Sequence, residues 1–175
     1  MRTLEHRRHS RRDPVSIHLS DQGRALARTV GATLPHFDRV VTSPKPRAIE
    51  TAEALGCRSA ATLDGLGQMP DEVGVSLDVL RLRSFAEYVA VIRQSEEMAA
   101  YAAGQAELWR TELERVPEGG TLLLVSHGGV IEFGAASALP REVPSWGPPL
   151  GYLEGVRLRW DGQRWVSGEV VRVLG

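Results

Sequence analysis

The amino-acid sequence predicts an α/β fold, a three-layer sandwich in which helices flank a mainly parallel sheet. Short strand-like segments alternate with longer helix-like segments along most of the chain, which is typical of this class. The run TLLLVS at residues 121–126 is continuously apolar, as buried parallel strands are. Residues 152–160 and 164–173 read as two strands joined at Asp161-Gly162, a strong turn signal. We expect this C-terminal hairpin to form an antiparallel edge of the sheet.

The first half of the chain predicts two strand–helix units. Residues 3–8 form the first expected strand, and a helix follows over residues 20–34, with a serine as its N-cap and a proline directly after it. Val40-Val41 lies in a short second strand. The next helix is expected to start at Ser43-Pro44 and to run to Leu55, where a glycine ends it.

The second half predicts a long helical region and a further strand–helix unit. Residues 62–74 contain glycine and proline and are expected to form a loop. Residues 77–116 are expected to be largely helical, with a break near Gln94-Ser95. After the apolar strand, residues 130–138 predict another helix, which Pro140 ends.

The bulk composition fits one globular domain over residues 1–175. The chain is 42% hydrophobic and 25% charged, which is ordinary for a protein with a buried core. Its 21 basic and 22 acidic residues give a net charge of -1, so the chain as a whole attracts neither nucleic acid nor an anionic membrane. We expect neither as a partner, and we expect any anion-binding capacity to be local.

The single cysteine, Cys57, excludes a disulfide within the chain and fits a reducing cytoplasm. The basic N-terminus is not followed by the apolar stretch of a signal peptide, and no uninterrupted apolar run approaches the length of a membrane span. We therefore predict a cytoplasmic protein. Cys57 follows a glycine after a helix and is interpreted as a buried or indifferent thiol rather than a nucleophile.

Three strand-to-loop junctions carry residues suited to catalysis: Arg8-His9, the segment TSPKPR that ends in Arg47, and His127 in SHGG. In an open parallel sheet, ligands bind at the carboxyl ends of the strands, so these junctions are expected to converge on one rim. Arg47 lies in the first turn of a helix, where the positive end of the helix dipole disfavours a cation. An anion bound between them would explain this placement.

These residue types match the requirements of phosphoryl transfer. The transferred group carries dispersed negative charge, and two guanidinium forks can hold its oxygens bidentately. A neutral imidazole is a nucleophile that works near neutral pH, and a second histidine can bond the phosphoryl oxygens. The amides of Gly128 and Gly129, at the start of a helix, add affinity for an anion. This chemistry needs neither a metal nor another cofactor.

Four segments, RRHS, LSDQGRALA, FDRVVTSPKPRAIETA and LLLVSHGGVI, resemble the histidine phosphatase superfamily, the phosphoglycerate-mutase-like proteins, in sequence and in order. The resemblance spans residues 7–131. It implies that His9 is the phosphorylated nucleophile, that Arg8 and Arg47 clamp the phosphate, and that His127 is the second pocket histidine. It also implies that the partner is a small phosphorylated metabolite or a phosphoprotein, acted on without a metal.

The sequence departs from the family pattern in its first strand. Ser10 replaces the usual glycine, so the backbone beside the nucleophile is less free to approach a ligand. Glu5, His6 and Arg7 occupy positions that are normally apolar. His6 has no arginine before it and lies three residues too early, so His9 is the preferred nucleophile. The spacing of His6 and His9 is possible for a metal, but no third cluster of ligands follows.

The general acid is the least defined part of the predicted site. The resemblance implies a Glu or Asp from the middle of the chain, but Gln68 stands where a glutamate is often found. Asp64, Asp71 and Glu72 are available, and Glu72 is the candidate we favour. An alkoxide leaving group gains roughly 10²–10⁴-fold from general acid help. Without an acid, the expected substrates are phosphohistidine proteins or activated phosphates.

The predicted function is therefore a metal-independent phosphatase that forms phospho-His9. A phosphoglycerate-mutase-type transfer would share every pocket residue, and a catalytically weak phosphate-binding or regulatory module would fit Ser10 and the missing acid. A purely structural protein would leave Arg47 unexplained. Arg11 and Arg12 either bind a second substrate anion or are solvated, and both readings stay open. His18 and His36 are expected at the surface, and the four tryptophans in packing.

Overall fold

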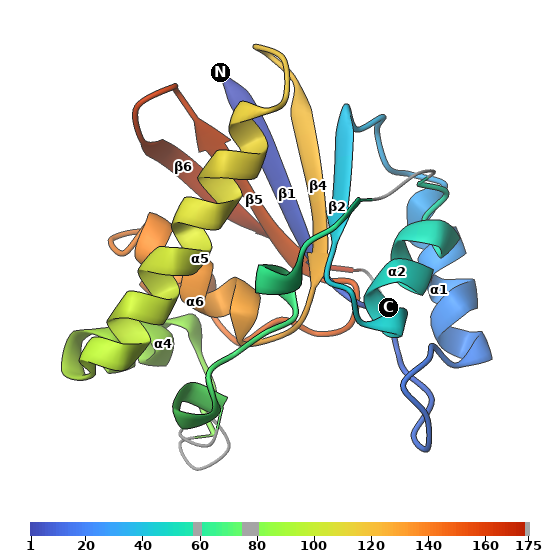
Figure 1. The fold of residues 1–175 in the computed structure, drawn as a ribbon, viewed down its shortest axis with the longest axis horizontal. Helices are drawn as coiled ribbons and strands as arrows, with labels where there is room; N and C mark the ends of the chain where they lie inside the picture. Colours follow the sequence, from blue (N-terminus) through green and yellow to red (C-terminus); the bar gives the residue numbers. More distant parts are fainter. Residues whose placement is uncertain (58–60, 75–80, 174–175) are drawn as a thin grey trace.

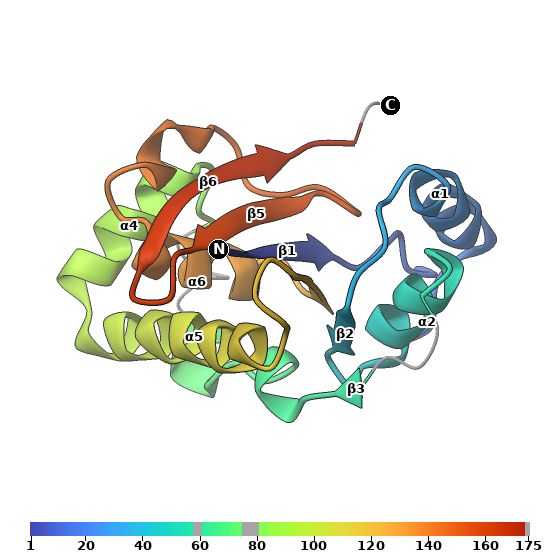
Figure 2. The ribbon, with the colours of Figure 1, turned by 90° about the horizontal axis from the view of Figure 1, so that it is seen from above.

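The computed structural model describes residues 1–57, 61–74 and 81–173. Within these residues, six strands form one sheet in the order β3-β2-β4-β1-β5-β6 (Figures 1 and 2). The β1–β4, β4–β2 and β2–β3 pairs are parallel, and β5 is antiparallel to both β1 and β6. This confirms the predicted mainly parallel sheet with a C-terminal antiparallel hairpin. The strands are β1 Arg2–Arg8, β2 Arg39–Thr42, β3 Ala61–Thr62, β4 Thr121–Ser126, β5 Gly155–Trp160 and β6 Trp165–Val171.

Helices cover both faces of the sheet, as the three-layer prediction requires. Helices α1 and α2 lie together on one face, and α4, α5 and α6 lie on the other (Figure 2). Each face buries its own apolar cluster against the sheet. None of the helices in the described residues is long and apolar enough to cross a membrane. The helices are α1 Asp21–Gly31, α2 Pro46–Ala54, α4 Phe85–Gln94, α5 Glu96–Glu114 and α6 Val130–Ala138, with short 3-10 helices η1 Asp64–Leu66 and η2 Val143–Trp146.

The two N-terminal helices differ in their limits from the predicted ones. The Ser20 hydroxyl accepts the Gly23 amide as the predicted N-cap of α1, but the helix ends at Gly31, before the proline. Helix α2 begins at Pro46 rather than at Ser43-Pro44, which corrects the prediction. The reason is that Ser43 still continues the strand: its amide donates to the Val125 carbonyl at 2.9 Å.

The middle of the chain is partly helical. The segment predicted as a loop over residues 62–74 begins with the end of β3, contains η1 and is helical at residues 71–74, which corrects the prediction. The predicted helical residues 77–80 lie outside the described residues. Helix α4 starts only at Phe85, behind an N-cap at Ser84. The predicted break is confirmed, because Ser95 ends α4 and caps α5. Helix α6 has the predicted limits of 130–138.

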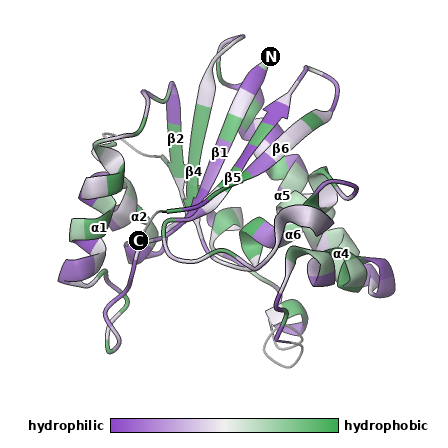
Figure 3. Cartoon of the chain, turned by 180° about the vertical axis from the view of Figure 1, so that it is seen from behind, coloured by the Kyte–Doolittle hydropathy of each residue, from purple (hydrophilic) through white to green (hydrophobic). Residues whose placement is uncertain are grey.

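Strand β1 is polar although it lies between β4 and β5 in the sheet (Figure 3). Glu5, His6 and Arg7 are all buried, and each has a polar partner. Glu5 accepts from Arg7 and from Arg157, so its charge is compensated. On the opposite face, His6 Nε2 lies 2.6 Å from the Ser126 hydroxyl. These pairs explain how a central strand accommodates three polar side chains.

Candidate active site

The carboxyl ends of β1, β2 and β4 border a hollow of about 390 Å³. The four residues predicted to surround an anion come together here, although the sequence separates them by more than a hundred positions. Gly128 also lines the hollow. The lining residues are Arg8, His9, Arg47, Arg81, Leu82, Tyr88, His127, Gly128, Gly129, Glu132, Pro149 and Leu150.

His9 is held in one orientation directly after β1. Its amide donates to the Ser126 carbonyl at 2.8 Å, which extends the pairing with β4. Its ring Nδ1 lies 2.7 Å from the Ser10 carbonyl oxygen. Because a carbonyl only accepts, Nδ1 carries the proton and Nε2 keeps its lone pair. The Arg47 Nε donates to this Nε2 at 3.2 Å, so the free lone pair of His9 points toward a guanidinium group.

Both pocket histidines are neutral at physiological pH. Burial lowers the pKa of His9 to about 4; the Ser10 carbonyl opposes this shift and the positive charges of Arg47, Arg8 and Arg12 add to it. Burial likewise lowers the pKa of His127 to about 3, helped by Arg47 and His9. The two rings lie 5.3 Å apart between centroids. The pocket therefore presents two neutral imidazoles beside permanent positive charge.

Arg8 ends β1, and its guanidinium contacts several neighbouring groups. Its Nη1 donates to the Leu150 carbonyl at 2.6 Å. A Cβ added to Gly128 would lie 3.4 Å from both Cζ and Nε of Arg8, so glycine lets the guanidinium lie close to the backbone. The Tyr152 ring covers it from another side, with Cζ 4.9 Å from the ring centroid. Nε is buried and has no partner among the described residues.

Arg47 occupies the first turn of α2, as predicted, where no acidic residue accompanies it. Burial lowers its pKa, and the charges of Arg12 and Arg8 lower it further. Among the described residues, neither Arg8 nor Arg47 pairs with a carboxylate. Cations gathered at a positive helix end destabilise one another unless an anion lies between them. The arrangement is that of a site for an anion.

His127 follows β4 and is anchored by the strand next to it. Its Nε2 lies 2.7 Å from the Ser43 hydroxyl, which accepts the Lys45 amide at 3.1 Å. A hydroxyl that already accepts one bond can donate its own proton to Nε2, which leaves Nδ1 protonated. Nδ1 is buried without a partner in the part of the chain that the structure describes.

Ser10, which replaces the glycine of the family pattern, links the loop after β1 to both helices of the adjacent face. Its hydroxyl donates to the Gly23 carbonyl at 2.7 Å, and its amide donates to the Thr51 hydroxyl at 2.9 Å. Gly23 is required where this loop crosses α1, because a Cβ there would lie 2.0 Å from the Arg11 carbonyl oxygen. The serine side chain thus bonds to α1 rather than entering the hollow.

Three of the lining residues that were not predicted from the sequence carry a polar or charged group: Arg81, Tyr88 and Glu132. Arg81 has a φ of 47°, an uncommon value for a residue other than glycine. Glu132 is 1% exposed and accepts the Gly129 amide through Oε2 at 2.7 Å. This corrects one expectation, because the Gly129 amide is used inside the protein and is not free for a ligand. A glutamate three residues after an N-cap was the signal that could have identified this contact.

The candidate acid Glu72 is exposed and is not among the residues that line the hollow. Its role as general acid stays a prediction. Arg12 is exposed, but its charge acts on both His9 and Arg47, whereas Arg11 donates to Gln22 at 3.2 Å. No three histidine, cysteine, aspartate or glutamate side chains of the described residues cluster as a metal site.

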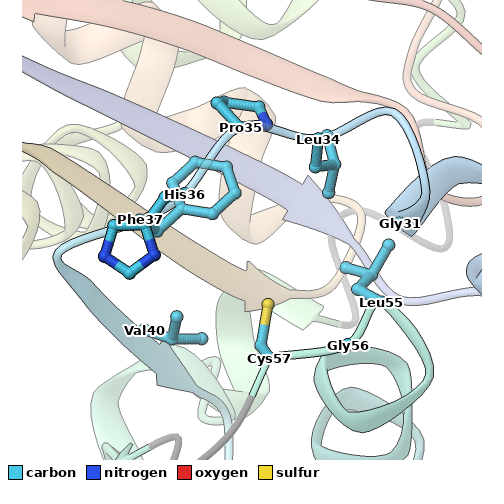
Figure 4. A pocket seen from close by; sticks show the side chains of 9 residues that line it. All are labelled: Gly31, Leu34, Pro35, His36, Phe37, Val40, Leu55, Gly56 and Cys57. Atoms are coloured by element: carbon cyan, nitrogen blue, oxygen red, sulfur yellow. The ribbon is translucent and has the colours of Figure 1, made fainter.

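A second hollow, of about 430 Å³, lies at the other end of β2, between the ends of α1 and α2 (Figure 4). Its walls are mostly apolar, and burial raises the pKa of the Cys57 thiol that lines it. A raised pKa disfavours the reactive thiolate, in line with the interpretation of Cys57 from the sequence. The four candidate catalytic residues all line the first hollow instead.

The fold and this hollow define an α/β protein with two histidines and two arginines at the carboxyl edge of its sheet. The family model described as histidine phosphatase superfamily (branch 1) matches residues 3–69, which include His9 and Arg47. Over these residues the chain is similar to the histidine phosphatase superfamily. No curated protein sequence matches the chain significantly.

Solved structures of phosphatases share the fold over nearly the whole chain. Phosphoserine phosphatase from Entamoeba histolytica, in complex with 3-phosphoglyceric acid, is 19% identical with a TM-score of 0.72, and the match covers 97% of each chain. Mycobacterial glucosyl-3-phosphoglycerate phosphatase with bound VO3 is 21% identical with a TM-score of 0.58, covering 95% of this chain and 96% of that one. The protein histidine phosphatase SixA, complexed with tungstate, is 20% identical with a TM-score of 0.54, covering 95% and 96%.

Proposed function

We propose that this protein is a metal-independent cytoplasmic phosphatase that works through a phosphohistidine intermediate on His9. The observation that carries the proposal is the state of the His9 ring: Nδ1 is fixed on a carbonyl, and Nε2 points its lone pair toward the Arg47 guanidinium. A ring held in this way is a ready nucleophile for a group that Arg47 also binds. Two of the structural neighbours hold phosphate-like oxyanions, VO3 and tungstate, which supports the same use of the fold.

The proposed reaction has two steps. In the first, His9 Nε2 attacks phosphorus in line, and the bond from phosphorus to the leaving atom breaks with its electron pair. Arg8 and Arg47 neutralise the phosphoryl oxygens, and the His127 ring donates a hydrogen bond to one of them. In the second step, water attacks phosphorus, inorganic phosphate leaves and neutral His9 is restored. The arginines supply the charge that a metal supplies elsewhere.

The pocket favours leaving groups that need little protonation. Glu132 is the carboxylate that lines the hollow among the described residues, and both of its oxygens accept backbone amides. An alkoxide without general acid help loses roughly 10²–10⁴-fold in rate. The imidazole of a phosphohistidine and an activated phosphate depend on it less. We therefore infer that the substrate is a phosphohistidine protein or a small activated phosphate.

The test is a panel of phosphorylated substrates assayed in the presence of a chelator. The panel contains a phosphohistidine protein, p-nitrophenyl phosphate, phosphoserine and 3-phosphoglycerate. Phosphate release is expected to be unaffected by the chelator and fastest on the first two. Labelled substrate should leave an adduct on the protein that is stable in base and labile in acid.

Three results would contradict this function. Loss of activity with the chelator would show that a metal takes part. Interconversion of phosphoglycerates without phosphate release would identify a mutase. Binding of inorganic phosphate with no turnover of any substrate would identify a silent phosphate-binding module.

The pH dependence of kcat/KM follows from the His9 pKa of about 4. A histidine is nucleophilic when it is neutral, and His9 is neutral at every pH above its lowered pKa. We expect the enzyme's acid limb near pH 4, instead of near the ordinary value of 6.5. The profile should be measured with two substrates whose phosphate groups differ in their second pKa. Only an acid limb that is common to both substrates belongs to the enzyme. A common limb near pH 6.5 would show that His9 is not desolvated as described.

A further inference from the structure

Glu132 joins two loops that border the hollow. Its Oε2 accepts the amide of Gly129, in the turn after His127, and its Oε1 accepts the amide of Leu150 at 2.9 Å. The side chain is 1% exposed. A buried carboxylate is costly to desolvate, and backbone amides at both oxygens offset part of that cost. The contact is therefore specific, and it connects segments about twenty residues apart in sequence.

The Leu150 end of this connection continues to Arg8. The Leu150 amide is held by Glu132, and the Leu150 carbonyl accepts Arg8 Nη1 at 2.6 Å. Leu150, which Glu132 fixes, therefore holds one nitrogen of the Arg8 guanidinium. The Arg8 Nε is buried and has no partner among the described residues. The orientation of the phosphate clamp depends on where Leu150 lies.

We propose that Glu132 is a positioning residue for phosphate binding, which acts through Leu150 on the Arg8 guanidinium. The proposal rests on the function proposed above for the same hollow. Both carboxylate oxygens of Glu132 accept a backbone N–H group, one from Gly129 and one from Leu150. A proton placed on the side of either oxygen that faces its N–H group would break that hydrogen bond. Burial raises the pKa of Glu132, and the backbone amides at both oxygens and the charge of Arg8 oppose this shift. Because both oxygens already face N–H groups, we infer that Glu132 positions Arg8 and does not act as the general acid.

The first experiment compares Glu132→Gln with a matched control, Glu112→Gln. Glutamine keeps one acceptor but places an amide N–H against the other backbone N–H, so one loop is released. Glu112 on α5 is also buried, at 3% exposed, but it pairs with Arg39 at the start of β2, away from the hollow. Calorimetric titration with inorganic phosphate and with vanadate is expected to show on the order of 10-fold weaker binding or more for Glu132→Gln. Glu112→Gln is expected to lower the melting temperature and leave both affinities unchanged.

The second experiment tests whether the effect passes through Arg8. In an Arg8→Ala background, Glu132→Gln is expected to change phosphate affinity little, because the group that it positions is absent. If the two losses simply add, Glu132 does not act through Arg8 and the proposal is wrong. Glu132→Asp keeps the charge but is one methylene too short to reach both amides. It is expected to lose affinity in the same Arg8-dependent way, and it serves as the test variant if Glu132→Gln does not fold.

The outcomes separate this inference from the proposed function. If the unaltered protein binds neither phosphate nor vanadate, the phosphatase assignment fails. If it binds both and Glu132→Gln binds them equally well, the positioning role fails while the phosphatase assignment stands.

Discussion

His9→Ala is expected to abolish the acid-labile phosphoryl adduct and to lower kcat by roughly 10⁴- to 10⁶-fold, the loss found when a covalent nucleophile is removed from an enzyme. Alanine leaves no nucleophile facing the bound phosphoryl group, so water would have to attack the substrate directly. Arg8, Arg47 and His127 remain in place, so inorganic phosphate is still expected to bind. The measurements are the stoichiometry of labelled adduct and phosphate release in a single turnover.

The matched control for this variant is His36→Ala. His36 is exposed and lies just before β2, at the end of that strand away from the hollow. It is expected to leave both the adduct and kcat unchanged. An adduct that persisted in His9→Ala would place the phosphorylated atom elsewhere, with His127 as the nearest ring. That result would contradict the assignment of His9 but not the location of the site.

The four pocket residues could be predicted to come together because each lies at the end of a recognisable strand or in the segment just after it. Apolar runs and caps are local signals, so the limits of α6 and the break at Ser95 were predicted correctly. Parallel strands align their carboxyl ends, so residues directly after β1 and β4 meet without any knowledge of side-chain contacts. His9 and His127 are brought together by this rule alone.

The parts that the sequence did not predict depend on contacts between distant segments. Arg81 reaches the hollow from the middle of the chain, and Glu132 reaches the Leu150 amide from α6. The start of α2 was misplaced because Ser43 bonds to a neighbouring strand, which its own sequence does not reveal. Likewise, the polar residues of β1 are stable only because partners such as Arg157 approach from β5.

Among the variants described, Trp109→Ala is expected to destabilise the protein most, lowering the free energy of unfolding by about 3–5 kcal/mol. The indole is fully buried on α5, and its ring lies edge-on to His6 with centroids 4.7 Å apart. It fits so closely against α6 that a Cβ on Gly134 would lie 2.2 Å from its Cζ2 atom. Truncation would leave a cavity between two helices and the central strand, which the rigid sheet cannot close. Urea unfolding followed by circular dichroism measures the loss.

Two companion variants separate cavity formation from other causes. Trp165→Ala removes the same side chain from β6, where it is only partly buried against Trp160, and a much smaller loss is expected. Gly134→Ala adds a methyl group where the indole already lies, so it should destabilise by overpacking while Trp109 is intact. The Trp109 N–H has no partner in the described residues, so Trp109→Phe removes packing without breaking a hydrogen bond. Its loss of unfolding free energy should lie between those of Trp165→Ala and Trp109→Ala. If Trp109→Ala cost no more than Trp165→Ala, the close packing of α5 and α6 would not be what stabilises this side of the sheet.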